Sequence, residues 1–145
     1  MSFGMQTYSA AGAVIVFGPN VITGFAEDTF VEIEYDSDAF EIRKGADGGV
    51  TRAQMMDLSG KVTVTLKGES LSNNALSAIA QMDRLLMAGV YSFMFVDGTG
   101  TTKATAAQAW VKKIPAVEYG KNPGNRKWEL TLAQLNLNVG GTLPL

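Results

Sequence analysis

The sequence predicts a mainly β protein, an antiparallel β-sandwich or barrel with one flanking α-helix. Hydrophobic and polar residues alternate with a period of two along most of the chain, which is typical of half-buried strands. Amphipathic strands favour antiparallel sheets, because the strands of parallel sheets are buried on both faces. A length of 145 residues with 46% hydrophobic side chains suits one compact unit, so we expect residues 1–145 to form a single domain.

The first predicted strands lie in the N-terminal third. Residues 13–17 form an apolar run that ends at Gly18 and Pro19, as a buried strand followed by a turn would. Residues 30–36 alternate three apolar side chains on one side with three carboxylates on the other. The apolar set is Val31, Ile33 and Tyr35, and the acidic set is Glu32, Glu34 and Asp36.

Two further segments repeat this alternation. Residues 40–43 predict a strand from which Phe40 and Ile42 point inward to the core. Residues 61–67 are the clearest case, with three apolar side chains on one side and four polar ones on the other. The polar side consists of Lys61, Thr63, Thr65 and Lys67.

One helix is predicted between residues 72 and 88. Residues 70–74 offer several capping side chains, and Gly89 suits the left-handed position that ends a helix. Four apolar residues recur at helical spacing, and we expect them in the core. They are Leu76, Ile79, Met82 and Leu86.

The C-terminal part of the chain predicts three more strands. Residues 90–96 and 104–113 read as a pair joined by a glycine-containing turn over residues 97–102. The last strand, over residues 128–139, changes phase: Trp128, Leu130 and Leu132 precede Leu135, Leu137 and Val139. A bulge near residues 133–134 would return both sets to one core face.

Residues 44–58 fit none of these strands. About fifteen residues without a structure of their own are uncommon in a compact domain, and such segments are usually functional or disordered. We interpret the segment as an extended arm that reaches a partner, with a merely mobile hairpin tip as the alternative. Its contact candidates are Lys44, Asp47, Arg52, Met55, Met56 and Asp57.

The composition excludes most catalytic chemistry. With no cysteine and no histidine, the chain has neither thiolate nor imidazole for metal binding or nucleophilic catalysis. The paired carboxylates Glu32 and Glu34 lack an aromatic-lined cleft of the kind that carbohydrate hydrolysis needs, and residues 98–103 lack the spacing of a phosphate-binding loop. We therefore expect a protein that is not an enzyme and that has no catalytic residues, metal or cofactor.

Charge is distributed unevenly along the chain. The net charge is −2, yet residues 1–42 hold seven acidic residues and no basic one, and residues 43–145 hold all twelve basic residues. The acidic balance argues against a protein that grips nucleic acid, which needs an excess of Lys and Arg. Oppositely charged segments suggest contacts between copies, although charge runs are more often solvated surface. The N-terminus shows neither a secretory signal nor the roughly 20 apolar residues of a membrane span, so we expect no membrane insertion.

The order of these elements resembles the tail tube proteins of contractile-tailed bacteriophages. The resemblance begins with the apolar strand and continues through VITGFAEDTF (residues 21–30) and FEIRKGADGGVTR (residues 40–52). It extends through the amphipathic strand at 61–67 and the helix to the final strand. Tubes of R-type bacteriocins and type VI secretion are related, so the resemblance also fits those machines.

The resemblance implies hexameric rings that stack into a tube inside a contractile sheath, with strands joining between subunits into a ring-wide inner β-barrel. Residues 44–58 then become an inter-ring loop, and DNA passes through the lumen during ejection without specific binding. The other implied partners are the sheath, baseplate, tail terminator and tape measure proteins. The implied location is the virion tail, assembled in the host bacterial cytoplasm.

The polar strand faces would line the channel of such a tube, and an acidic wall would repel DNA phosphates. The lumen candidates are Glu32, Glu34, Asp36, Thr63 and Thr65. A basic stretch near the C-terminus would contact the sheath or a neighbouring subunit, through Lys121, Arg126 and Lys127.

Two alternatives remain at this point. The chain could be the tube subunit of a non-phage contractile injection system. It could also be a monomeric β-sandwich that binds glycans on the aromatic residues Trp110, Tyr119 and Trp128.

Overall fold

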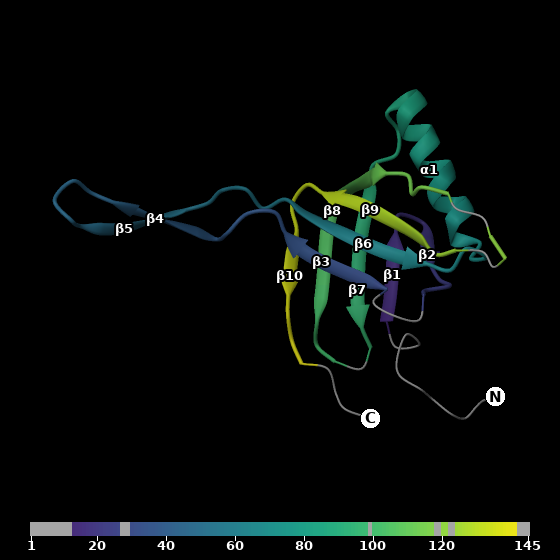
Figure 1. The fold of residues 1–145 in the computed structure, drawn as a ribbon, viewed down its shortest axis with the longest axis horizontal. Coiled ribbons are helices and arrows are strands. Elements are labelled where there is room, and N and C mark those ends of the chain that lie inside the picture. The colour runs from purple at the N-terminus through teal and green to yellow at the C-terminus, as the bar shows by residue number, and fades with distance from the viewer. Residues whose placement is uncertain (1–12, 27–29, 99, 118–119, 122–123, 142–145) are drawn as a thin grey trace.

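A computed structural model describes residues 13–26, 30–98, 100–117, 120–121 and 124–141. These residues form ten strands and one helix, with a long hairpin that projects from the main body (Figure 1). The strands are β1 (Ala13–Phe17), β2 (Asn20–Ile22), β3 (Val31–Tyr35), β4 (Phe40–Lys44), β5 (Val50–Gln54), β6 (Gly60–Leu66), β7 (Tyr91–Asp97), β8 (Lys103–Lys113), β9 (Arg126–Leu132) and β10 (Asn136–Asn138). The helix α1 spans Ser72–Leu86. The predicted mainly β fold with one helix is confirmed.

Eight strands form one antiparallel sheet in the order β2-β1-β7-β8-β9-β6-β3, with β10 also paired to β8. In Figure 1, β1, β7, β8 and β10 run along one direction, and β3, β6 and β9 cross them in front. The long strand β8 connects the two layers, because its first half pairs with β7 and β10 and its second half pairs with β9. The sheet thus folds over on itself as a sandwich.

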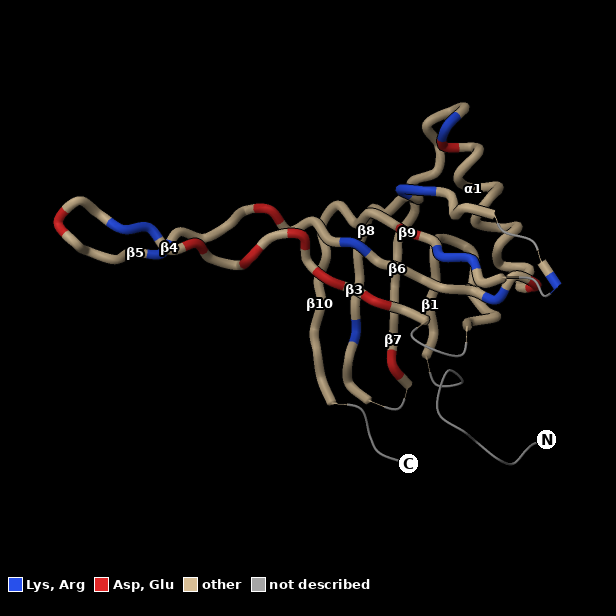
Figure 2. The backbone as a smooth tube through the Cα atoms, in the orientation of Figure 1, with Lys and Arg blue, Asp and Glu red and all other residues tan. Residues whose placement is uncertain are grey.

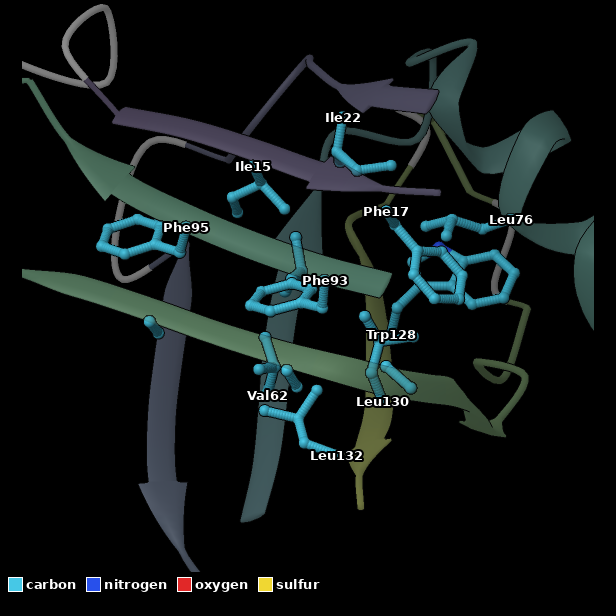
Figure 3. Close-up of a cluster of buried hydrophobic side chains, with 14 of the residues drawn as sticks. Ile15, Phe17, Ile22, Val62, Leu76, Phe93, Phe95, Trp128, Leu130 and Leu132 are labelled. Carbon is cyan, nitrogen blue, oxygen red and sulfur yellow. The ribbon is translucent and has the colours of Figure 1, made fainter. Parts of the chain in front are cut away.

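The core lies between the two layers (Figure 3). Phe17 and Phe93 come from the back layer, whereas Trp128, Leu130 and Val62 come from the crossing strands, and all five are at most 2% exposed. Alanines of β8 lie between them, where small side chains let the two layers approach closely.

Only the first half of α1 contributes to the core. Leu76 and Ile79 are buried, but Met82 is 42% exposed and Leu86 is 72% exposed, so the prediction that all four apolar residues lie in the core is wrong. The helix leaves the sandwich after its second turn. It ends at Met87, which adopts the left-handed conformation (φ 55°) in place of the predicted Gly89.

The phase change in the last predicted strand is confirmed. β9 ends at Leu132, and the chain bends through residues 133–134, where the Ala133 N–H donates to the carbonyl of Gln108. Leu135 is buried again on the core side. Val139 is 75% exposed and lies beyond β10, so its predicted place in the core is wrong.

The predicted loop at 44–58 is part of a longer hairpin. β4 pairs with β5 in register, and this two-stranded ribbon makes no strand pairing with the main sheet. Phe40 and Ile42 were predicted to point into the core, yet they are 42% and 72% exposed. They alternate on a two-stranded ribbon, and no helix or strand of the described residues forms a second layer over either of its faces. We call residues 37–58 the arm.

Candidate assembly surfaces

The outer side of β3, β6 and β9 is one continuous polar surface, which we call the polar face. Cross-strand pairing places Thr63 between Glu32 and Glu129, and Lys61 between Glu34 and Thr131. The residues on the opposite side of β6 and β9 are buried in the core. On β3, Val31 and Ile33 are half-buried and Tyr35 is 38% exposed, so the predicted place of Tyr35 in the core is wrong. Alternation along three adjacent strands therefore brings four of the five lumen candidates together, and Asp36 follows at the end of β3.

Basic and acidic residues both occur along β3, β6 and β9 (Figure 2). Lys61 Nζ lies 3.2 Å from Glu34 Oε1. The hydrogen bond to Glu34, and then the negative charge of Glu34, raise the pKa of Lys61. β9 adds Glu129 and Lys127, which face Thr63 and Thr65 respectively. The predicted predominantly acidic wall therefore needs correction: bases and threonines are interspersed with the acids. The contribution of β9 was missed because its place beside β6 depends on sheet order.

The basic stretch proposed for sheath contact is divided by its strand. Lys127 pairs with Thr65 and so lies on the polar face, whereas Arg126 pairs with Leu66 and points to the opposite side. Arg126 Nη1 donates a 3.0 Å hydrogen bond to the carbonyl of Gly124. Lys121 is exposed in the preceding connection. Lys127 thus cannot serve the outer surface if the polar face lines a channel.

The arm is a solvent-exposed β-ribbon. Arg52 lies over the Phe40 ring, with 4.1 Å between the guanidinium carbon and the ring centroid, and this contact joins β4 to β5. At the tip, Asp47 Oδ1 accepts a hydrogen bond from the Gly49 N–H, and Gly48 has a positive φ of 86°. Lys44 ends β4 beside this turn. The ribbon is therefore internally ordered without support from the sandwich.

A cluster of hydrogen bonds holds the root of the arm. The Ser59 hydroxyl lies 2.7 Å from Asp57 Oδ1 and 2.9 Å from Asp36 Oδ2, and the Ser37 hydroxyl donates to Asp57 Oδ2 at 2.9 Å. The hydrogen bonds from Ser59, followed by that from Ser37, lower the pKa of Asp57. These bonds tie the outgoing and returning strands together where they leave the sandwich.

The two methionines of the arm differ in exposure. Met55 is half-buried in a pocket of about 250 Å³, where it lies with Tyr35, Phe40 and Leu58. Its N–H donates to the carbonyl of Ala39, which closes the β4–β5 ladder. Met56 is 84% exposed. The root of the arm thus presents apolar surface that a single copy leaves uncovered.

The aromatic residues of the glycan-binding alternative do not form a platform. Trp128 is 2% exposed, and its Nε1–H donates a 2.8 Å hydrogen bond to Asn73 Oδ1 within the core. Trp110 is half-buried on β8, and Tyr119 lies outside the described residues. Within the described ranges, no helix is long and apolar enough to cross a membrane, and no group of three or more acidic residues could hold a metal ion.

The fold is similar to that of tube and tube-terminating proteins of contractile injection systems. The anti-feeding prophage cap, a tube-terminating cap, gives a TM-score of 0.61 at 11% identity and covers 95% of both chains. A chain of the sheath–tube complex of the extracellular contractile injection system PVC, in its extended state, gives 0.56 at 12% identity, with 87% of each chain covered.

The sequence comparisons define the family. A family model described as Bacteriophage PhiTE tail tube protein matches residues 9–140, and the chain belongs to this family of phage tail tube proteins. The chain is also 27% identical over 124 residues to "Structural protein ORF10" of Pseudomonas phage KPP10, which covers 84% of this chain and 72% of that protein. The resemblance seen in the sequence is thereby confirmed.

Proposed function

We propose that this tail tube protein assembles into hexameric rings that stack into a DNA-conducting tube enclosed by a contractile sheath. The observation that supports this most strongly is the arm, a ribbon that carries apolar side chains far from its own core. Ile42 is 72% exposed, Val50 is 64% exposed and Met56 is 84% exposed. Each strand of the ribbon alone spans about 17 Å, so it can reach a subunit in an adjacent ring.

The polar face suits the wall of a water-filled channel. Threonines and charges of both signs keep the surface hydrated. Because acidic residues lie between the lysines, the surface has no continuous row of basic side chains that could bind DNA phosphates. DNA therefore passes without specific binding. The wall consists of residues from three strands, with Asp36 at its end near the arm. They are Glu32, Glu34, Lys61, Thr63, Thr65, Lys127, Glu129 and Thr131.

The partners follow from this placement. The rings bind each other through the arm, whose residues Lys44, Asp47, Arg52, Met55, Met56 and Asp57 supply the inter-ring contacts. The sheath covers the outer surface, and Lys121 and Arg126 contact it or a neighbouring subunit. A terminator closes one end of the tube, the baseplate holds the other, and a tape measure protein occupies the lumen during assembly. The structures of a tube-terminating cap and of a sheath–tube complex with this fold support the terminator and the sheath as partners.

The chain acts as a structural part of the virion tail, assembled in the bacterial cytoplasm, and not as an enzyme. The phage family and the phage relative favour a phage tail over a non-phage injection system. The structural neighbours from injection systems keep that second machine as the alternative.

Removal of the arm tests the proposal. Replacing residues 40–54 by a short Gly-Ser turn removes both exposed strands and leaves the core untouched, so we expect a folded protein that forms rings but no long tubes. Asn74→Ala is the control, because Asn74 is exposed on α1 and lies outside the arm. Negative-stain electron microscopy reads both variants beside the unmodified chain. Long tubes from the armless variant would refute the axial role of the arm.

A further inference from the structure

The C-terminal end of α1 is an exposed apolar surface. Leu85 is 79% exposed, Leu86 is 72% exposed and Met87 is 86% exposed, and this end of the helix stands clear of the sandwich (Figure 1). Successive residues of a helix point about 100° apart, so Leu85 and Leu86 cover different sides of the helix end, and Met87 follows them. We call these three residues the knob. Contiguous apolar side chains on a surface mark an interaction site, whereas single ones do not.

The backbone at Met87 supports a role for its side chain. Met87 has a positive φ of 55°, a left-handed conformation that glycine adopts without strain and that a Cβ disfavours. Its N–H donates to the Asp83 carbonyl at 2.8 Å, a bond that glycine at this position would make equally well. The helix end therefore does not need a methionine, and the side chain is useful only where something covers it.

A basic groove lies beside the knob. It has a volume of about 460 Å³ between α1 and the end of β8, and it contains Arg84, Lys112 and Lys113. The one carboxylate among its lining residues, Asp83, accepts a hydrogen bond from the Gly89 N–H at 3.1 Å. The three basic side chains make no ion pair with any acidic residue that the structure describes. The groove thus presents positive charge that this chain leaves unpaired.

We propose that the knob and the basic groove together form the surface on which an acidic amphipathic segment of the sheath protein docks. The inference rests on the proposed tube and assigns a sheath contact within it. Acidic side chains of the segment pair with the three bases of the groove, and its apolar side chains cover the knob. Arg84 and Leu85 are adjacent in the chain, so one short segment reaches both parts.

The lining of the groove suits an amphipathic partner. Ala80, Val111 and Ile114 form the apolar part of the lining, between the bases and the core. A helix with one apolar side and one acidic side satisfies the knob, this apolar lining and the bases at the same time, which is the usual way in which an amphipathic helix binds a groove.

A second copy of this chain is the poorer source of such a segment. In the proposed tube, Glu32 and Glu34 of β3 lie on the channel wall, so the acidic strand of a neighbour is not available to the groove. The acids of the arm alternate with Arg43, Lys44 and Arg52, and α1 carries one acid and one base. The helix contributes no residue to the polar face, so the knob is free to meet the protein that encloses the tube. Complementary charge then determines which partner binds.

Replacement of the knob is the first test. Leu85→Gln with Met87→Gln changes two exposed side chains and leaves the core intact, so we expect tubes of normal appearance in negative-stain electron microscopy. Sheath protein of the same phage is then added to preformed tubes, and bound sheath is measured by co-sedimentation. We expect its affinity for the tubes to fall about tenfold. Leu71→Gln is the matched control, because Leu71 is also 79% exposed but lies at the other end of α1.

Charge reversal in the groove is the second test. Lys112→Glu places a carboxylate where the acidic segment docks, and we expect sheath affinity to fall about fivefold or more, with normal tubes. Lys103→Glu is the matched control, since it makes the same change in charge on an exposed lysine at the other end of the same strand.

Each outcome decides a different part of the inference. Normal sheath binding by both test variants would overturn the docking surface and leave the proposed tube standing. Loss of tubes from the Leu85/Met87 variant alone would overturn the sheath as the occupant and assign the knob to a contact between copies. Normal binding by Lys112→Glu beside weakened binding by the knob variant would overturn the acidic character of the segment. If the unmodified chain forms no tubes, or its tubes bind no sheath protein, the proposed function fails and the inference fails with it.

Discussion

Asn73→Ala should destabilise the fold strongly, although Asn73 is only half-buried and lies in the first turn of α1. Asn73 Oδ1 accepts the hydrogen bond of the buried Trp128 indole at 2.8 Å, and its Nδ2 donates to the carbonyls of Lys67 and Ser70 at 2.9 and 3.0 Å. One side chain thus connects α1, the chain that enters it and the largest buried residue of the core. Alanine removes all three bonds.

The magnitude follows from the burial of each partner. Trp128 is 2% exposed, so its unpaired N–H costs about 1–3 kcal/mol. The two carbonyls are nearer to water, which replaces part of their bonds, and they add about 1 kcal/mol together. The total is a loss of about 2–4 kcal/mol, which corresponds to a fall in Tm of about 5–12 °C for a domain of this size.

Urea unfolding followed by tryptophan fluorescence measures this loss in the free energy of unfolding. Asn74→Ala is the control, because Asn74 is exposed one position further along the helix and should change stability by less than about 0.5 kcal/mol. In a Trp128→Phe background no indole N–H remains, so Asn73→Ala should cost about 1–2 kcal/mol less there. Equal costs in both backgrounds, or a loss below about 0.5 kcal/mol in the unmodified chain, would refute the reasoning.

Two further predictions concern the sheet and the arm root. Gly60→Ala would bring a Cβ to 2.5 Å from Leu135 Cδ2 and 2.7 Å from the Glu34 carbonyl oxygen, so the free energy of unfolding in urea should fall by about 1–3 kcal/mol. Gly120→Ala is the control and should be neutral, because nothing lies within 4 Å of a Cβ added there. Equal stability of the two variants would contradict this prediction. Because hydrogen bonds from Ser59 and Ser37 lower the pKa of Asp57 in the fold, their stabilisation is present above the ordinary pKa of 3.8 and is lost as pH falls through the lowered value. An NMR titration should place the Asp57 midpoint below 3.8, and Ser59→Ala should raise it; a midpoint at or above 3.8 in the unmodified chain would be inconsistent with the cluster.

The sequence predicted the strands whose alternation is enforced by a core. β6 alternates buried and half-buried residues along its whole length, because one of its faces packs in the core. The phase change after Leu132 was also predictable, because a strand that keeps one face buried must gain a residue when its pattern shifts.

The arm strands were assigned to the core for the opposite reason. Phe40 and Ile42 alternate with charged residues just as core strands do, but their partner strand β5 brings no second layer. Alternation of apolar and polar residues with a period of two predicts a strand, but it does not predict whether another layer covers the apolar face of that strand. The exposed end of α1 follows the same logic, since helical spacing continues to Leu86 after the sandwich has ended.

The assembly surfaces were only partly predictable. Glu32 and Glu34 share a strand with Asp36 in sequence, so their common face followed from geometry. Lys127 and Glu129 join them through β6, and Lys112 and Lys113 share a groove with Arg84 because the end of β8 lies beside α1. Both facts are properties of sheet order and packing, which residues far apart in the chain determine together.

A cryo-electron microscopy reconstruction of the assembled chain tests the central claim most directly, namely that the polar face of β3, β6 and β9 lines the channel of a stacked tube. The account predicts stacked rings with Glu32, Glu34, Thr63 and Glu129 on the channel wall and the arm in contact with the next ring. A tube with these four residues on its outer surface would contradict the account.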